Sequence, residues 1–175
     1  IYFDHFRRLL RPPGDNDLAS FDFRSRSRRP PTDRVNALLS FLYSMLIKDV
    51  IVATLASGLD PYVGLYHRPK FGRPALALDL AEEFRALICD STALMLINNG
   101  EIRPGDFIER GGAFSLTKRG RKQTISAYER RMKTELKHPL FGYQASYRRA
   151  LEIQARLLAA ALLGDTPRYR SLTTR

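Results

Sequence analysis

The chain has 175 residues, about the length of one domain. Hydrophobic residues make up 44% of it, enough for a folded core, and the single Cys89 excludes both a disulfide framework and a cysteine-rich zinc module. The formal net charge is +11, with +9 on residues 101–175 and −1 on residues 36–100. Such a basic excess is typical of proteins that bind nucleic acid or an anionic membrane, with a merely solvated basic surface as the simpler alternative.

The first 31 residues predict one short helix and a loop. Pro12 and Pro13 end the helix, whose apolar positions recur at helical spacing: Tyr2, Phe6, Leu9 and Leu10. The segment from Gly14 to Pro31 is rich in Asp, Ser and Arg, and we interpret it as a mobile basic loop.

A long apolar helix follows. Thr32 or Asp33 can cap its N-terminus, and Gly58 is well placed to end it. Its apolar face consists of Val35, Leu38, Leu39, Leu42, Leu46 and Val50. Lys48 and Asp49 interrupt the apolar stretch near its centre, which favours a buried helix over a membrane span. Because no secretory signal is visible, we expect a cytoplasmic protein.

The middle of the chain predicts a structured loop, a second long helix and a hairpin. The loop Leu59–Pro74 is rich in Gly and Pro, and loops of this length are often functional. The helix extends over about Leu76–Asn98. Alternating apolar and polar residues around a Gly-Gly pair predict a short β-hairpin near residues 106–117, with Phe107-Ile108 against Phe114–Leu116.

Two further helices and a tail complete the predicted fold. Helical patterns extend over Lys118–Leu136 and Gln144–Leu163, and Gly164 ends the second. We therefore expect an all-α, mainly helical domain at residues 1–164 with one short hairpin, followed by a loose basic tail at residues 165–175.

Several carboxylates and one imidazole occur in the near-neutral middle of the chain. His67 lies in the Gly/Pro loop, and Asp79, Glu82 and Glu83 lie at the start of the second long helix. Because positions i, i+3 and i+4 share a helix face, Asp79 can pair with Glu82 or with Glu83. Oxygen ligands with one imidazole suit a magnesium or manganese ion, although the helix dipole alone also favours acidic residues in a first turn.

Long motifs occur in a fixed order along nearly the whole chain. They are RPPTDRVNALLSFLY at 29–43, GLDPYVGLYH at 58–67, GRPALALDLAEEFR at 72–85, FSLTKRGR at 114–121, HPL at 138–140 and YRRALEIQAR at 147–156. Together they resemble the catalytic domain of the CRISPR-associated integrase family, Cas1, the enzymes of spacer acquisition.

The resemblance implies a metal site and assigns residues to it. In the family a glutamate, a histidine and a downstream acidic residue hold the metal, and the last two match His67 and Glu82. Asp79 is a close helper that adds a further hard oxygen ligand, and His67 either binds the metal or relays a proton. Glu83 is then a helix-surface charge, and Arg85 suits a phosphate contact near the metal.

Two features of the family lie outside the sequence. The first metal-ligand glutamate of the family precedes a Tyr-Phe pair, which is Tyr2-Phe3 here, so we expect it upstream of Ile1. The N-terminal β-rich domain of the family is absent as well. The chain is thus expected to be the C-terminal helical domain of a longer protein, without one metal ligand.

Asn36, in the Asn-Ala-Leu-Leu stretch, either supports the site or caps the backbone.

A reaction and a set of partners also follow from the resemblance. In the family, the 3′-hydroxyl of a captured DNA fragment attacks a phosphodiester at the edge of a CRISPR repeat, and Mg²⁺ or Mn²⁺ assists this transesterification. The implied partners are double-stranded DNA, a second copy of the chain, the small protein Cas2 and a fused or associated N-terminal domain, but no membrane. The candidate DNA contacts are Arg85, Lys118, Arg119, Arg121, Lys122, Arg130, Arg131, Arg148 and Arg149.

Two other functions are compatible with the sequence. One is a transposon integrase that shares the catalytic domain but serves a mobile element, which differs in its choice of DNA target. The other is a non-catalytic helical DNA-binding fragment, for which the missing glutamate argues. Manganese binding near His67 distinguishes this last alternative from an integrase.

Overall fold

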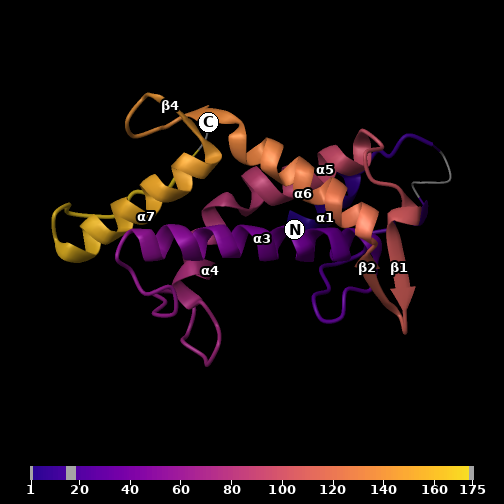
Figure 1. Cartoon of the computed structure of the whole chain (residues 1–175), viewed down its shortest axis with the longest axis horizontal. Coiled ribbons are helices and arrows are strands. Elements are labelled where there is room, and N and C mark those ends of the chain that lie inside the picture. The colour runs from indigo at the N-terminus through magenta and orange to yellow at the C-terminus, as the bar shows by residue number, and fades with distance from the viewer. Residues whose placement is uncertain (1, 15–18, 174–175) are drawn as a thin grey trace. The chain divides into compact units, whose positions relative to one another are not determined.

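The computed structural model describes residues 2–14 and 19–173, and Figure 1 labels its elements. This part of the chain is mainly helical, with two small antiparallel strand pairs, which confirms the predicted fold class. The chain forms two compact units: a first unit of residues 1–44 and 89–130, and a second unit of residues 45–88 and 131–175.

Most of the predicted elements are present, with altered boundaries. In chain order they are α1 (Tyr2–Phe6), the 3-10 turn η1 (Arg7–Leu9), α3 (Arg34–Ala56), α4 (Ala75–Phe84), the π-helix η2 (Arg85–Asp90), α5 (Ser91–Asn98), the 3-10 turn η3 (Pro104–Asp106), β1 (Phe107–Arg110), β2 (Ala113–Leu116), α6 (Lys118–Lys133), β3 (Glu135–Lys137), β4 (Gln144–Ser146) and α7 (Tyr147–Leu163). The helix predicted at 76–98 is therefore three segments, because a π-helical stretch separates α4 from α5.

Helix α3 begins and ends as its sequence predicts. The Asp33 carboxylate accepts a hydrogen bond from the Asn36 backbone N–H (2.7 Å), so Asp33 is the cap. Gly58 follows the helix with φ +76°, and the Leu59 N–H closes the end on the Thr54 carbonyl (3.0 Å). The helix is long and apolar enough to span a membrane by length and composition. Its six predicted apolar positions are nevertheless fully buried within the protein: Val35, Leu38, Leu39, Leu42, Leu46 and Val50.

The described part of the segment before α3, residues 19–31, is packed rather than mobile, which corrects our interpretation of it there, whereas residues 15–18 lie outside the described residues. Phe21 and Phe23 are buried in the first unit. The Arg26 guanidinium donates to Asn36 Oδ1 (2.7 Å) and to Ser40 Oγ (2.9 Å). Asn36 is fully buried, accepts from the Ser27 N–H (3.0 Å) and donates to the Ser25 carbonyl (2.8 Å), so it braces the preceding backbone, and its expected support of the site stays a prediction.

The hairpin β1–β2 is confirmed and is slightly longer than expected. Phe107 pairs with Leu116 at one end and Arg110 with Ala113 at the other. Gly111 and Gly112 join the strands, both with positive φ (57° and 75°), a combination that glycine adopts without a steric penalty.

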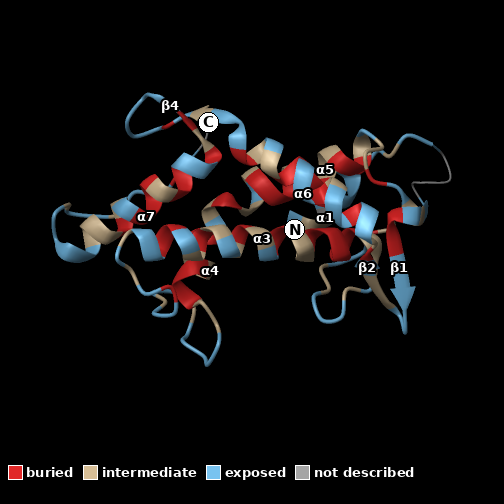
Figure 2. Ribbon diagram, in the orientation of Figure 1, coloured by how far each residue is buried: buried red, intermediate tan, exposed pale blue. Residues whose placement is uncertain are grey.

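A second strand pair in the second unit replaces parts of two predicted helices. Helix α6 ends at Lys133, and β3 then pairs with β4, with Leu136 opposite Ala145. Helix α7 begins after Ser146, whose hydroxyl accepts from the Arg149 N–H (3.2 Å) and caps it. The helical periodicity therefore extended too far at both places. Figure 2 shows buried residues along one side of α7, with exposed residues on the other.

Candidate metal centre and nucleic-acid interface

The loop from Leu59 to Pro74 has a fixed shape that depends on close backbone packing. Two N–H groups of the first turn of α4, those of Leu76 and Ala77, donate to the Pro61 carbonyl (2.9 and 3.2 Å). At Gly64 an added Cβ would lie 2.5 Å from the His67 carbonyl oxygen and 2.6 Å from the Ala75 Cβ. Only glycine fits there, so Gly64 allows the loop to fold back onto the start of α4.

Asp79, one turn into α4, holds the end of this loop with both carboxylate oxygens. Its Oδ2 accepts from the N–H groups of Leu65 (2.7 Å) and Tyr66 (2.9 Å), and its Oδ1 accepts from that of His67 (2.9 Å). Burial works to raise the pKa of Asp79, but these hydrogen bonds outweigh it and lower the pKa below its usual value. The carboxylate is therefore ionised at neutral pH and is committed to the loop.

The same carboxylate orients the imidazole of His67. His67 Nδ1 lies 2.5 Å from Asp79 Oδ1, and both side chains are mostly buried. An ionised carboxylate only accepts hydrogen bonds, so in a neutral ring the proton is on Nδ1 and Nε2 presents a lone pair. This is the arrangement in which a carboxylate prepares a histidine to bind a metal ion through its other nitrogen.

Glu82 contacts different groups from those that Asp79 contacts. Its side chain is 48% exposed and forms an ion pair with Arg85 (2.7 Å), one turn further along the helix. Within the described part of the chain, no three His, Cys, Asp or Glu side chains gather closely enough to hold a metal ion. The structure thus joins His67 to Asp79 and joins Glu82 to Arg85, and the predicted ligand set remains a prediction.

Glu83 is not a surface charge, which corrects its assignment. Its carboxylate accepts hydrogen bonds from the Tyr169 hydroxyl (2.5 Å), the Leu172 N–H (2.8 Å) and Gln154 Nε2 (3.0 Å). Leu172 is buried, so the expectation of a loose tail is wrong for residues 169–172. The partners are 71 to 89 residues away in sequence, and no local pattern indicated them.

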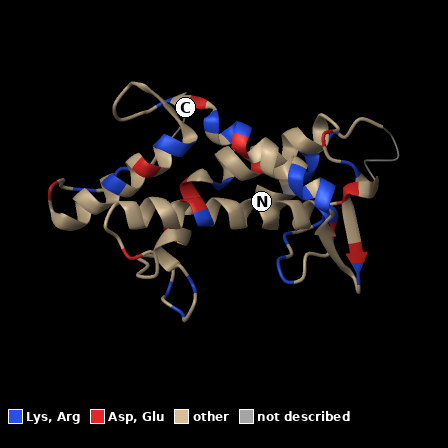
Figure 3. Ribbon diagram, viewed as in Figure 1, with Lys and Arg blue, Asp and Glu red and all other residues tan. Residues whose placement is uncertain are grey.

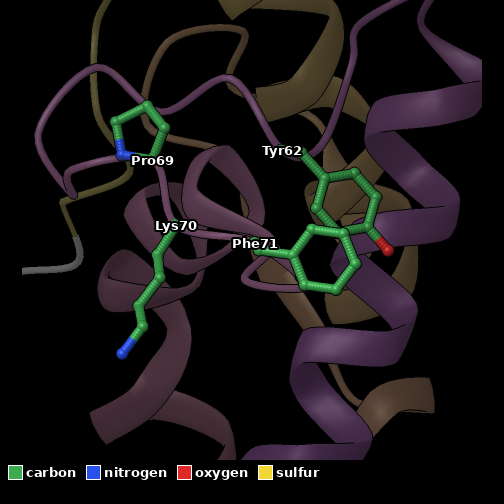
Figure 4. Close-up of a pocket in the computed structure, with 5 residues that line it drawn as sticks. Tyr62, Pro69, Lys70 and Phe71 are labelled. Carbon is green, nitrogen blue, oxygen red and sulfur yellow. The ribbon is translucent and has the colours of Figure 1, made fainter.

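The loop also carries basic and aromatic side chains that the sequence analysis did not select. Phe71 and Tyr66 are almost fully exposed, and Arg68, Lys70 and Arg73 lie between or beside them. Figure 4 shows a shallow pocket lined by Tyr62, Pro69, Lys70, Phe71 and Gly72. The run Arg-Pro-Lys-Phe-Gly-Arg at 68–73 was the available signal, because basic and aromatic residues together are typical of single-strand binding.

Seven of the nine predicted DNA contacts are exposed, and Arg85 and Arg131 are partly buried. Figure 3 colours the described Lys and Arg residues blue. In the first unit, five of the predicted contacts are exposed along α6: Lys118, Arg119, Arg121, Lys122 and Arg130. Arg119 lies 3.5 Å from the Asp106 carboxylate, and Arg130 forms an ion pair with Glu101 (2.5 Å).

In the second unit the remaining candidates have partners of their own. Arg148 lies 3.6 Å from Asp49, and Arg149 forms an ion pair with Glu152 (2.5 Å). Arg131 is half-buried and contacts protein groups, so internal packing accounts for its position.

Comparisons with known proteins agree with the sequence motifs. The family described as CRISPR associated protein Cas1 matches residues 1–130. The chain is 58% identical over 174 residues to a CRISPR-associated exonuclease Cas4/endonuclease Cas1 fusion of Geobacter sulfurreducens, which covers 99% of this chain and 31% of that protein. This chain spans about half or less of the length of the curated relatives that it matches.

Solved structures show the same fold. A Cas1 protein from Thermotoga maritima superposes with a TM-score of 0.82 and 28% identity over 93% of this chain and 48% of its own. A chain of a Cas6-RT-Cas1–Cas2 complex superposes with a TM-score of 0.80 and 25% identity over 98% of this chain and 18% of its own. The match to most of the chain confirms the family that the motifs suggested: this protein belongs to the Cas1 family of CRISPR-associated proteins.

Proposed function

We propose that this chain is the helical catalytic part of a DNA integrase of CRISPR spacer acquisition. In this reaction the 3′-hydroxyl of a captured DNA fragment attacks a phosphodiester of the CRISPR repeat, and one phosphodiester is exchanged for another. Family membership and the endonuclease names of the relatives support the reaction class. The observation that carries the proposal is the contact of His67 Nδ1 with Asp79, which prepares Nε2 as a ligand in a loop flanked by basic residues.

The residues present fit Mg²⁺ or Mn²⁺ as part of its ligand set. His67 would bind through Nε2, and Glu82 would bind through the carboxylate that now pairs with Arg85. Because both oxygens of Asp79 hold the loop, we assign Asp79 the orientation of His67 and not a metal bond. A third donor is the glutamate that the family resemblance places before Tyr2-Phe3.

The chain's own residues prepare the reacting groups. A bound divalent ion supplies a positive charge that stabilises the attacked phosphate and the departing oxygen. Asp79 keeps the proton of His67 on Nδ1, so the other ring nitrogen, Nε2, carries the lone pair. Arg85 lies beside Glu82 and would contact a DNA phosphate when Glu82 turns to the ion.

Exposed basic side chains would bind the rest of the DNA. Those on α6 and on the loop at 68–73 would contact backbone phosphates, which gives affinity for any sequence and suits fragments of arbitrary origin. The name of the Cas6-RT-Cas1–Cas2 complex supports Cas2 as a partner, and the name of the Geobacter protein supports an attached Cas4 domain. A homodimer in the cytoplasm completes the proposal.

The test uses the longer parent protein with its upstream segment, purified with Cas2. His67→Ala and Glu82→Ala should abolish strand transfer into a repeat-containing duplex and should weaken Mn²⁺ binding, measured by electron paramagnetic resonance, while the melting temperature changes little. The matched control is Glu109→Ala, an exposed carboxylate on β1. Wild-type rates in the His67 and Glu82 variants would refute the site. Transfer only into a transposon target, or no Mn²⁺ binding by the wild type, would refute the function in favour of its two alternatives.

A further inference from the structure

The described part of the C-terminal segment is bound to the helix that carries the candidate site residues. Glu83, on α4, accepts a hydrogen bond from the Tyr169 hydroxyl on one carboxylate oxygen and from the Leu172 backbone N–H on the other. These two contacts join chain positions that lie 86 and 89 residues apart. A segment that could have extended into solvent is thus attached to α4 within the second unit.

Gln154 on α7 fixes the same segment from another side. Its side chain is fully buried, and its Nε2 lies within hydrogen-bond distance of Glu83 (3.0 Å), the Tyr169 hydroxyl oxygen (2.8 Å) and the Arg170 carbonyl (3.1 Å). Burial, together with the charge of Glu83 and its hydrogen bond, raises the pKa of Tyr169 far above its usual value. Tyr169 is therefore a neutral hydroxyl that donates to Glu83 at every physiological pH.

The location of Glu83 gives this contact a consequence for the site. Glu83 follows Glu82 directly and lies one turn after Asp79 on α4. Glu82 is half exposed, with Arg85 of the adjoining helical turn as its ion-pair partner, so the position of its carboxylate depends on where the α4 backbone lies. Any rotation of α4 that moves Glu82 would have to break the hydrogen bonds of Glu83.

We propose that Glu83, Gln154 and Tyr169 form a clamp by which residues 169–172 hold α4 and so position Glu82 relative to His67. The effect on the metal rests on the proposed function, whereas the restraint on α4 does not. The three are positioning residues, because they act on the site through the helix backbone. This assignment separates the roles of two adjacent carboxylates: Glu82 is half exposed beside Arg85, and Glu83 binds the C-terminal segment.

The experiment compares Tyr169→Phe and Glu83→Gln with Tyr143→Phe in the parent protein. Tyr143 is a half-exposed tyrosine outside the clamp, so Tyr143→Phe controls for the loss of a hydroxyl. Hydrogen exchange of the α4 amides in metal-free protein should be at least about five-fold faster in Tyr169→Phe, because local opening no longer breaks the Glu83 bond. The Mn²⁺ dissociation constant, from spin-resonance titration, should rise by about five-fold or more, within the range known for groups behind metal ligands. Glu83→Gln retains an acceptor for Tyr169 and should have a smaller effect.

The two readouts separate failure of the clamp from failure of the proposed function. Unchanged α4 exchange in both variants would overturn the clamp, whether or not the protein binds metal. Faster exchange with an Mn²⁺ dissociation constant equal to that of Tyr143→Phe would show that the contact only stabilises the fold, and would overturn the positioning role. A wild-type protein that binds no Mn²⁺ and transfers no strands would refute the proposed function, and the exchange rates would still decide whether the clamp restrains α4.

Discussion

Arg131 binds the carbonyl oxygen of Leu87 with two nitrogens of its guanidinium, Nε at 2.8 Å and Nη2 at 2.6 Å. Leu87 lies inside the π-helix, where the wider turns change the partners of the backbone carbonyls. The guanidinium also stacks over the Tyr147 ring, 4.9 Å from its centre. A residue proposed for DNA binding on its charge alone is therefore a packing residue of the second unit, where it connects Leu87 of the π-helix with Tyr147 of α7.

We predict that Arg131→Ala lowers the free energy of unfolding by about 2 kcal/mol, because charge-assisted hydrogen bonds and a cation–π contact are lost together. Urea unfolding followed by circular dichroism measures it. Arg130→Ala is the control, since the adjacent side chain is exposed and a surface substitution changes stability by about 0.5 kcal/mol or less. Equal stability of the two variants would contradict a structural role for Arg131.

The exposed residues of α6 should contribute to DNA binding and not to stability. Substituting Lys118, Arg121 or Lys122 singly by Ala should leave the unfolding free energy nearly unchanged and weaken binding to duplex DNA of any sequence. Each should also reduce the slope of log affinity against log salt by about one, as expected for one lost phosphate contact. Fluorescence anisotropy at several salt concentrations gives the slope. The control is Arg110→Ala at the hairpin end of β1, and a slope unchanged in all three variants would remove α6 from the DNA interface.

Local patterns predicted the elements whose signals lie close together in the chain. The Asp33 cap, the Gly58 end of α3 and the Gly-Gly hairpin depend on neighbours within a few residues, and all three are present. The proximity of His67 to Asp79 also follows from a short separation of 12 residues. The role of Asp79 could not be predicted from the sequence, because it binds three backbone N–H groups of the loop and every residue type except proline has such a group.

The features that sequence reasoning missed depend on distant partners. The role of Glu83 requires Tyr169, 86 residues away, and the pairing of β3 with β4 overrides a helical period that continues through both segments. The family resemblance implied Glu82 as the principal ligand and Asp79 as its close helper, but not that Asp79 holds three loop N–H groups while Glu82 is half exposed.

Asp79→Asn tests the orientation of His67 with nearly the same side-chain shape. The amide has one acceptor oxygen in place of two and no charge, so it holds fewer loop N–H groups and no longer selects the proton on Nδ1. We expect Mn²⁺ binding to weaken by about 10- to 100-fold, as for other groups that orient a metal-binding histidine. Asp49→Asn, a carboxylate 3.6 Å from Arg148, is the matched control. Unaltered Mn²⁺ affinity in Asp79→Asn would remove this role.

Gly64→Ala should distort the loop without touching any candidate ligand. The new methyl group would lie 2.5 Å from the His67 carbonyl and 2.6 Å from the Ala75 Cβ, and both belong to tightly packed segments. We expect a loss of about 1–3 kcal/mol in unfolding free energy, typical of overpacking, and reduced strand transfer by the parent protein. Gly105→Ala is the control, because its added Cβ meets nothing within 4 Å. Similar stability and activity of the two variants would show that the loop adapts easily.

His138 should make stability depend on pH in a mildly acidic range. Burial lowers the pKa of His138, and the nearby Gln154 side chain only partly offsets this, so the folded protein binds the proton less readily than the unfolded chain does. The unfolded state then gains protons first as the pH falls below about 6.5, the ordinary value for histidine. Stability attributable to this group is therefore complete above that pH and decreases as the pH falls toward the lowered folded pKa.

The measurement is the difference in melting temperature between wild type and His138→Gln at pH 7.5, 6.5, 5.5 and 5.0. Taking the difference at each pH cancels the contributions of every other titrating group, including the two other histidines. The stabilising effect of the native His138 should be largest at pH 7.5 and should shrink steadily below about pH 6.5, because only the wild type must accommodate a charge on a buried imidazole. A difference that stays constant with pH would show that His138 is protonated equally in both states, and a difference that grows on acidification would reverse the sign of the argument.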